Sequence, residues 1–404
     1  MRNSVYLLFL FCFSIATSFV HMQEMVMFIH VPKCGGVTVL SALQNEYSQE
    51  NILNCGGEAD LVSYHLSLFE FKQLFDVPQF KLITFLRHPV DRVLSEQRYC
   101  MGRFRDHSDS CLRGHRLPPE GDPIYTASNI ACKMLSGLND ADPSISIEMH
   151  LEHAKKALKE QYFFVGITEK MEESIQVLYS QLGWKIPEKI TRFNISPGQF
   201  DFSEEVLQGI AERNKADIEL YELALELFES RKKQLGPFSN QPFYSADDYK
   251  DEFHYTFDQR LVGYGWGIRE PSFLYRWVDE GNESEVGFAL KDGHNYTLSC
   301  SIFIQPCLLN QFSAIVKNNP IQLQFSSIDS PADEYQWIRL EGEIPREFLE
   351  IGSQTIITFR MTPPTDPLLL EFYQKDDRQQ DFGLHYVRGK FACRSIDLVR
   401  VEDR

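Results

Sequence analysis

The sequence predicts an α/β protein: a phosphate-loop-type parallel sheet flanked by helices, followed by a C-terminal antiparallel β-sandwich. Three observations support this fold class. Up to about residue 234, short apolar runs alternate with longer segments of helical period. Two of the apolar runs end in short turns that open helices. Beyond residue 252 the pattern changes to short β-branched and aromatic runs separated by turn residues.

In the first part, apolar runs predict strands and amphipathic stripes predict helices. The strands are expected at residues 26–31, 62–66, 80–86 and 163–167. The helices are expected at residues 147–158, at residues 171–182 before Gly183, and as one long closing helix after Ser203. A parallel sheet with helical connections follows.

In the last part, alternating runs predict the strands of an antiparallel sandwich. They are expected at residues 286–290, 296–304, 321–325, 337–340 and 355–359. The expected organisation is an apolar signal or anchor segment at 1–24, an α/β domain at 25–236, a linker at 237–252 and a β-sandwich domain at 253–404.

Composition excludes some classes of function. The chain has 404 residues, 43% of them hydrophobic, which is ample material for the cores of two domains. The formal net charge of -17 argues against general affinity for nucleic acid, because such binding depends on neutralising phosphates with Lys and Arg. Any anionic ligand must be held by a local site.

The nine cysteines lack the spacing of a disulfide framework or of a zinc site, so mostly reduced thiols and no metal are expected. Two loop-closing pairs, Cys100 with Cys111 and Cys300 with Cys307, stay open at this point. Oligomeric state is not predicted.

Residues 5–20 form an uncharged apolar run, slightly short of the roughly 20 residues that span a bilayer. The run predicts a signal or anchor segment and hence membrane association. The alternative is a cytoplasmic protein whose translation starts at Met22 or Met25.

The first candidate site follows the strand at residues 26–31. It comprises Pro32, Lys33, Cys34, Gly35, Gly36, Val37 and Thr38. The two glycines let backbone N–H groups approach an anion at a helix N-terminus. Lys33 adds a positive charge and Thr38 a hydroxyl donor. The order of residues is not that of a Walker A loop, which disfavours ATP hydrolysis.

The second candidate site follows the strand at residues 80–86. Arg87 stands at the strand end, and a helix begins at Pro89, a favourable first helical position. Ser95 lies two turns further on, on a face that can return toward Arg87. The pair is suited to a second phosphate, while Arg92 is expected to be an exposed ion-pair partner.

Both motifs resemble those of the carbohydrate sulfotransferases, and their order and separation match as well. The first is similar to the family's Pro-Lys-Thr-Gly-Gly-Thr-Thr loop, with Cys34 and Val37 in place of two threonines. The second matches the family's Leu-Arg-x-Pro-x-x-Arg-x-x-Ser motif. The resemblance, strongest to the heparan sulfate 2-O- and 6-O-sulfotransferases, covers about residues 26–230 and implies the sulfotransferase fold.

The resemblance implies transfer of a sulfuryl group from 3′-phosphoadenosine 5′-phosphosulfate (PAPS) to a hydroxyl of a carbohydrate acceptor. The implied donor contacts are Lys33, Cys34, Gly35, Gly36, Val37, Thr38, Arg87 and Ser95. His65, which ends an expected strand between the motifs, corresponds to the family's catalytic base and would act with Lys33. Apart from the resemblance, the sequence offers a basic track for an anionic acceptor at Arg98, Arg103, Arg105, Arg113 and Arg116, with a solvated loop as the alternative.

Two other functions remain open. One is a nucleoside or sugar kinase of the phosphate-loop type. The other is a carbohydrate-binding protein whose transferase site has decayed. Val37 and Ala131 would suit such a protein, since the family has threonine and often glutamine at these positions. The C-terminal domain weakly resembles β-sandwiches appended to bacterial sugar-modifying transferases, through Gly263 to Gly267 and Tyr275 to Trp277. No catalysis is expected there, and its aromatic residues are expected in the core.

Overall fold

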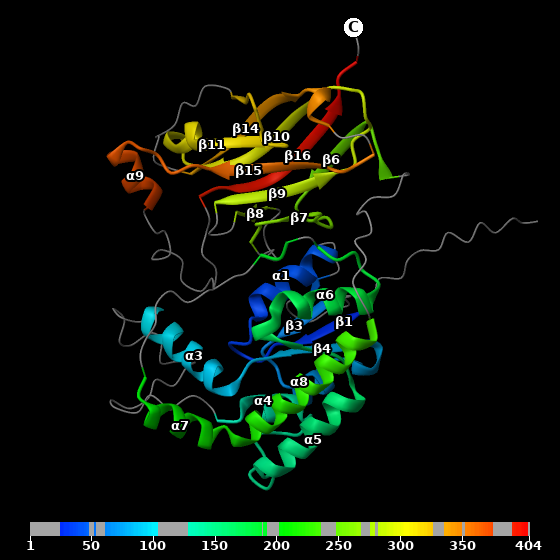
Figure 1. Cartoon of the computed structure of the whole chain (residues 1–404), viewed down its shortest axis with the longest axis vertical. Helices are drawn as coiled ribbons and strands as arrows, with labels where there is room; N and C mark the ends of the chain where they lie inside the picture. Colours follow the sequence, from blue (N-terminus) through cyan, green and yellow to red (C-terminus); the bar gives the residue numbers. More distant parts are fainter. Residues whose placement is uncertain are drawn as a thin grey trace, which may run out of the picture.

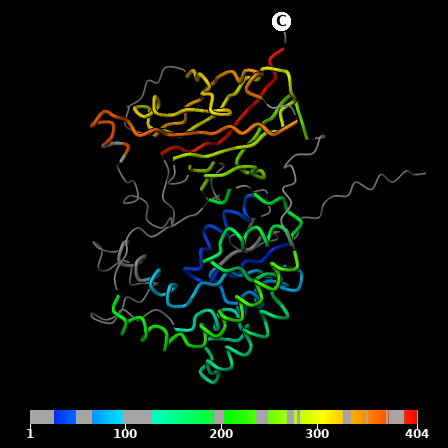
Figure 2. The backbone as a smooth tube through the Cα atoms, viewed as in Figure 1, coloured from blue at the N-terminus to red at the C-terminus, as the bar shows by residue number. Residues whose placement is uncertain are grey.

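In the computed structural model the chain forms an α/β unit and a C-terminal β-rich unit, one above the other (Figure 1). The structure describes residues 25–47, 52–53, 61–103, 128–187, 189–191, 202–235, 248–267, 275–278, 282–325, 335–349, 352–374 and 390–402. In the tube view the first unit runs from blue to green, and the second runs from green through yellow to red (Figure 2).

A five-stranded parallel sheet forms the centre of the α/β unit, in the order β2-β3-β1-β4-β5. Its strands are β1 (Val26–Ile29), β2 (Ile52–Leu53), β3 (Leu61–Tyr64), β4 (Lys81–Leu86) and β5 (Tyr162–Ile167). All four residues of β1 are buried, because helices cover both faces of the sheet. The predicted parallel sheet is therefore confirmed, and β2 was not predicted because two residues carry no period.

The helices follow the strands in the order expected for βα units. They are α1 (Gly36–Glu46), α2 (Leu68–Leu74), α3 (Pro89–Arg103), α4 (Ile130–Leu135), α5 (Ile147–Glu160), α6 (Met171–Leu182), α7 (Glu204–Arg213) and α8 (Lys215–Leu235). In Figure 1, α1 and α6 lie on the side of the sheet that faces the C-terminal unit, and α4 and α5 lie on the opposite side.

The expected single helix after Ser203 is two helices, because the chain breaks at Asn214. The Asn214 side-chain Nδ2 donates to the carbonyl oxygen of Ile210 at 2.9 Å, and its Oδ1 accepts from the backbone N of Asn129 at 3.0 Å. Asn side chains compete in this way with the helix backbone. The amphipathic stripe continues across the break, so the pattern alone predicted one helix.

The start of α4 is fixed by Asp217 of α8. Its two carboxylate oxygens accept from the backbone N of Ala131 at 3.0 Å and of Cys132 at 2.8 Å. Asp217 is 1% exposed, and burial raises the pKa of its carboxyl. The segment that begins at Asn129 thus has a structural role in joining α4 to α8.

The C-terminal unit consists of two antiparallel sheets. One has the order β13-β14-β10-β16-β6 with β8 paired to β16, and the other has the order β12-β11-β15-β9-β7. The strands are β6 (Glu252–Thr256), β7 (Gly263–Tyr264), β8 (Arg276–Trp277), β9 (Glu283–Phe288), β10 (Tyr296–Ile304), β11 (Phe312–Val316), β12 (Asn319–Ile321), β13 (Gln324–Phe325), β14 (Gln336–Ile344), β15 (Thr355–Met361) and β16 (Ala392–Arg400). A helix, α9 (Pro367–Gln374), follows β15.

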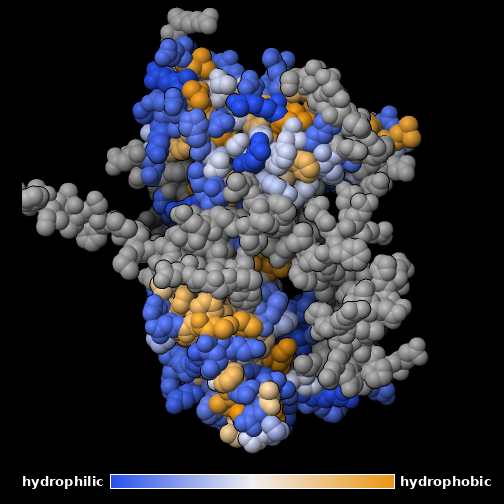
Figure 3. Space-filling view, turned by 180° about the vertical axis from the view of Figure 1, so that it is seen from behind, coloured by the Kyte–Doolittle hydropathy of each residue, from blue (hydrophilic) through white to orange (hydrophobic). Residues whose placement is uncertain are grey.

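Both sheets contribute to a single hydrophobic cluster. Leu298 and Ile302 of β10, Val286 of β9 and Phe359 of β15 are buried in it. The antiparallel β-rich character expected from the alternating runs is confirmed. Seen from behind, polar residues cover most of the described surface of both units, as the charged composition implies (Figure 3).

The two units meet at the C-terminal end of α1. The carbonyl oxygen of Asn45 accepts from the backbone N of Leu261 at 3.0 Å, and Asn45 Oδ1 accepts from Arg276 Nη1 at 2.6 Å. Glu46, whose carboxyl pKa is raised by burial, pairs with Arg260 at 2.6 Å. The C-terminal unit therefore supplies hydrogen-bond and ion-pair partners for the end of α1, the helix that follows the Lys33 loop.

One expectation about location is wrong. In the described part of the chain, none of the helices combines the length and the apolar character needed to cross a bilayer. This finding contradicts the expected membrane association through residues 5–20, a run shorter than a typical spanning helix. The segment 1–24 itself lies outside the described residues.

The two open cysteine pairs have different outcomes. Cys300 and Cys307 are not joined by a disulfide. The side chains of Cys100 and Cys111 lie outside the described residues, as do most of the expected linker and the side chains of the basic track that begins at Arg98.

We expect Asp217→Ala to lower the free energy of unfolding by about 2–4 kcal/mol, because two buried N–H groups lose their acceptor. Urea denaturation followed by circular dichroism measures the change. Asp140→Ala is the matched control: Asp140 is an exposed partner of Lys133, and its loss should cost less than about 0.5 kcal/mol. Equal effects of the two substitutions would refute the role given to Asp217.

Candidate functional site

The candidate site lies at the sheet edge where β1 and β4 end. These strands are parallel neighbours, so their carboxyl ends meet at one edge, with Ile29 aligned with Thr84. The Thr84 hydroxyl also donates to the carbonyl oxygen of Ile29 at 2.9 Å. The loops after β1 and β4, which carry Lys33 and Arg87, are consequently adjacent.

The first loop has a special backbone conformation. Lys33 adopts a left-handed φ of 65°, which is uncommon for a residue with a side chain, and Gly35 has a φ of 73°. The backbone N of Cys34 donates to the carbonyl oxygen of Val31 at 3.3 Å, which closes the turn before α1 begins at Gly36. Strained positions of this kind concentrate at ligand sites.

The turn directs the first N–H groups of α1 toward the end of the sheet, where a helix N-terminus favours an anion. Thr38, in the first turn of α1, is 4% exposed. Val37 beside it is half-buried and offers no hydroxyl. Lys33 is also half-buried.

Gly36 is required by the ring of His30. A Cβ atom built on Gly36 would lie 1.7 Å from Nε2 of His30, which is far inside van der Waals contact. The His30 ring stacks in turn on Phe28 at 5.3 Å between centroids. Gly36 therefore lets α1 start directly against the histidine that follows β1.

Cys34 is a structural thiol. It is 1% exposed, and burial raises its pKa to about 12. The thiol stays protonated at neutral pH, and a protonated thiol is a poor nucleophile. The loop therefore contains no activated cysteine for covalent catalysis.

The second loop contacts the first directly. Nη1 of Arg87 lies 3.5 Å from the carbonyl oxygen of Lys33. The helix α3 begins at Pro89 as expected, and Ser95 lies two turns into it with 7% of its surface exposed. The structure thus brings the Lys33 loop and Arg87 together on one side of the sheet.

Arg92 differs from its expected surface position. It pairs with Glu96 at 2.8 Å, but it is 1% exposed, and its Nε and Nη2 atoms are buried without a hydrogen-bond acceptor. Its positive charge lowers the pKa of both Cys34 and Asp217, although burial outweighs it at each. Arg92 is thus a buried cation close to Cys34 of the first loop.

A third junction, after β5, ties the two loops together. The Thr168 hydroxyl donates to the carbonyl oxygen of Cys34 at 2.9 Å, and Glu169 Oε1 accepts from the backbone N of His88 at 2.9 Å. Glu169 also accepts from the Tyr221 hydroxyl at 3.1 Å. We did not assign these residues a role from the sequence, although they follow a parallel strand just as Lys33 and Arg87 do.

His65 lies next to the first loop, just beyond β3. Its ring stands 4.1 Å from the His30 ring between centroids, and its Nδ1 is 3.0 Å from the carbonyl oxygen of His30. A carbonyl only accepts, so Nδ1 carries the hydrogen and Nε2 is the basic nitrogen of the neutral ring. His65 is exposed, so its ring is accessible to a bound molecule.

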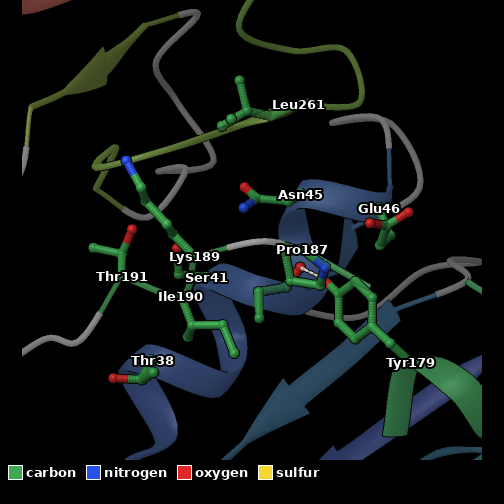
Figure 4. Close-up of a pocket in the computed structure, with 12 residues that line it drawn as sticks. Thr38, Ser41, Asn45, Glu46, Tyr179, Pro187, Lys189, Ile190, Thr191 and Leu261 are labelled. Carbon is green, nitrogen blue, oxygen red and sulfur yellow. Dashed lines mark hydrogen bonds between the residues drawn. The ribbon is translucent and has the colours of Figure 1, made fainter. Parts of the chain in front are cut away.

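A pocket opens along the flank of α1, between the two units (Figure 4). Its walls are Thr38, Ser41, Ala42, Asn45, Glu46, Tyr179, Pro187, Lys189, Ile190, Thr191, Leu261 and Gly263. Only Thr38 belongs to the predicted donor contacts, and neither Arg87 nor His65 lines it. The pocket therefore marks the seam between the units beside the site, rather than the site itself.

Within the described residues, no three or more His, Cys, Asp or Glu side chains are grouped to hold a metal ion. The chemistry that the described side chains offer is electrostatic, from Lys33 and Arg87, and basic, from His65.

Comparison with known proteins supports the resemblance found in the motifs. No family model matches the chain. The chain is 28% identical over 185 residues to heparan-sulfate 6-O-sulfotransferase 3 of Mus musculus, covering 38% of each protein. It is 27% identical over 190 residues to heparan-sulfate 6-O-sulfotransferase 1 of Cricetulus griseus, covering 39% of this chain and 47% of the relative.

The matched region thus spans less than half of the length of these relatives. A crystal structure of a mouse sulfotransferase complexed with PAP matches 49% of this chain and 66% of that chain. Its identity is 14% and its TM-score is 0.22, which is too low to support a conclusion. The predicted similarity to the heparan sulfate sulfotransferases is confirmed by the sequence matches.

We expect Gly36→Ala to destabilise the loop, because the new methyl group must displace the His30 ring. The substitution should lower the melting temperature, since overpacking typically costs 1–3 kcal/mol. The double variant His30→Ala/Gly36→Ala should recover most of the loss relative to His30→Ala alone, as a double-mutant cycle in differential scanning calorimetry would measure. Additive effects would contradict the proposed clash.

Proposed function

We propose that this protein is a sulfotransferase that moves a sulfuryl group from PAPS to a hydroxyl of a carbohydrate. The observation that carries the proposal is the contact between the two loops, with Arg87 Nη1 3.5 Å from the Lys33 carbonyl oxygen. Two basic residues from separate strand ends, next to a helix N-terminus, suit a ligand with two phosphate groups. The relatives' names supply the reaction class.

In this proposal the backbone N–H groups from Gly35 to Thr38 and the Lys33 ammonium hold the 5′-phosphosulfate. Arg87 and Ser95 hold the 3′-phosphate, the arginine through its forked guanidinium. Thr168 and Glu169 hold the two loops together through hydrogen bonds to their backbones. No step of the proposal uses a metal.

His65 is the proposed general base. Nε2 of its neutral ring takes the proton of the acceptor hydroxyl as the acceptor oxygen bonds to sulfur. The bond between sulfur and the 5′-phosphate oxygen breaks in the same displacement, and 3′-phosphoadenosine 5′-phosphate leaves. Lys33 stabilises the charge that develops on the leaving oxygen.

The acceptor class follows from the same relatives. Heparan sulfate is the polysaccharide in the names of these relatives, and we propose a polysaccharide of this acidic class as the acceptor. The sulfotransferase fold is proposed for residues 25–236, supported by the strand order β2-β3-β1-β4-β5. For residues 253–404 the core shared by both sheets supports a β-sandwich.

We expect Lys33→Ala to lower kcat/KM for sulfation by about a hundred- to thousandfold, as for loss of one transition-state donor. Transfer of labelled sulfate to a panel of glycans measures the effect. Lys156→Ala, on the exposed surface of α5, is the matched control and should be neutral. Activity of Lys33→Ala within about threefold of the parent protein would remove Lys33 from the mechanism.

A thermal-shift assay on the parent protein separates the proposed activity from its rivals. PAP at saturation should stabilise the parent protein, since a ligand at 100 times its Kd contributes about 2.7 kcal/mol. ATP should not do so. Stabilisation by ATP alone would favour a kinase, and no response to millimolar PAP would favour a decayed site.

We expect His65→Gln to lower kcat by about a hundred- to ten-thousandfold, because the acceptor hydroxyl loses its base. PAP binding, measured by the same thermal shift, should be unchanged, since the donor contacts remain. His153→Gln, an exposed histidine on α5, is the control. A variant of His65 that turns over normally would assign the base to another group.

A further inference from the structure

Five aromatic side chains gather on one face of the sheet that contains β10, near one end of its strands β14, β10 and β16. They are Tyr275, Trp277, Phe303, Tyr335 and Trp337, referred to below as the aromatic platform. Neighbouring rings lie 5.1 to 6.5 Å apart between centroids. The sequence predicted that aromatic residues of this domain belong to its core, and the structure contradicts this for the platform.

The register explains why these rings lie outside the core. Along β10 the residues Leu298, Cys300 and Ile302 face the shared hydrophobic cluster, so Phe303 points to the opposite face. Phe303 is aligned with Trp337 of β14 and with Ala392 of β16, and Ala392 is aligned with Trp277 of β8.

Trp337, Phe303, Ala392 and Trp277 thus form one row across four strands. At ~4.8 Å per strand, their Cα atoms span ~14 Å, the length of a short oligosaccharide. Ala392 between them is fully buried, and the rings of Phe303 and Trp277 on either side of it lie 5.9 Å apart between centroids. Tyr275 lies 5.3 Å from Trp337 and 6.4 Å from Trp277 between ring centroids, so it bridges the row.

The platform is accessible to a ligand. Trp337 is 37% exposed, and the other four rings are half-buried. A sheet that needs only a core places its large aromatic side chains on the inner face, as Trp266 and Phe359 are placed here. Large rings on the outer face indicate a binding surface.

The residues around the platform favour an acidic sugar chain over a protein. Its apolar members are all aromatic, and aromatic faces attract the polarised C–H groups of a pyranose ring. The guanidinium of Arg394 lies 4.7 Å from the Trp337 ring centroid and donates to the Ser301 hydroxyl at 3.3 Å. Arg339 lies two residues from Trp337 on the same face, paired with Glu341.

The chain as a whole has a net charge of -17, so the positive charge of Arg394 against the exposed Trp337 ring is a local exception. It complements a carboxylate or sulfate group on a sugar that stacks on the rings. This combination of stacking surface, cation and hydroxyl matches the chemistry of an acidic polysaccharide.

We propose that the aromatic platform is a second glycan site, which binds a segment of an acidic polysaccharide by stacking on Trp277 and Trp337 and by an ionic contact to Arg394. The choice of polysaccharide rests on the proposed function. The site acts in holding the chain of the acceptor and takes no part in the chemical step.

The test uses fluorine NMR of the full chain labelled with 5-fluorotryptophan. The chain has four tryptophans, two on the platform and two elsewhere, Trp184 and the buried Trp266. Single Trp→Phe substitutions assign the four resonances. Heparan sulfate oligosaccharides, added without donor, should shift the resonances of Trp277 and Trp337 and leave the other two unchanged.

Variants then measure the affinity from the same shifts. Arg394→Ala should weaken binding about tenfold, in line with loss of a central interface contact. Phe325→Ala is the matched control, because Phe325 is 48% exposed on β13 but aligned with the inward-facing Leu340. It should leave the affinity unchanged. A neutral glucan of the same length should bind at least about tenfold more weakly.

Absence of shifts at Trp277 and Trp337 would overturn the proposal, as would equal losses for Arg394→Ala and Phe325→Ala. Equal binding of the neutral glucan would overturn the acidic class of ligand. Lys33→Ala should give the same shifts as the parent protein. A parent protein that gives these shifts but transfers no labelled sulfate to any glycan would refute the proposed function alone.

Discussion

The geometry of the candidate site depends on the short segment after β5, which binds the loops after β1 and β4. The Thr168 hydroxyl donates to the Cys34 carbonyl oxygen in the first loop, and the Glu169 carboxylate accepts from the backbone N of His88 in the second loop. These contacts go to main-chain atoms, so they fix loop positions without using the side chains that a ligand needs. With β1, β4 and β5 adjacent in the sheet, three strand ends form one rigid frame.

The parallel sheet could be predicted from the sequence because its strands are buried on both faces and read as continuous apolar runs. The Lys33 and Arg87 loops could be predicted because each follows such a run. The edge strand β2 could not be predicted, because a two-residue strand has no period. The break at Asn214 could not be predicted either, because a side-chain cap leaves the amphipathic stripe intact. Glu169 also follows a parallel strand, but an acidic residue in that position does not by itself predict a contact to the backbone of another loop.

In the C-terminal unit, alternation predicts strands and separates their two faces, but it does not predict the aromatic platform. The outward positions of β10 and β14 are polar or charged except for Phe303 and Trp337, and one ring in a polar set does not by itself indicate a surface cluster. The strand pairing brings these isolated rings together in one row. The membrane segment was inferred from hydropathy alone, and no helix of the described chain supports it.

The seam between the units has a consequence for engineering. The last turn of α1 has its carbonyl group at Asn45 satisfied by Leu261, and the buried carboxylate of Glu46 satisfied by Arg260. On β8, Arg276 reaches back to Asn45 while its neighbour Trp277 faces outward. A chimaera that replaces the C-terminal unit must therefore reproduce Arg260, Leu261 and Arg276, or the grafted fusion leaves a helix end uncapped beneath it. The C-terminal unit can therefore be exchanged only together with the residues that contact α1.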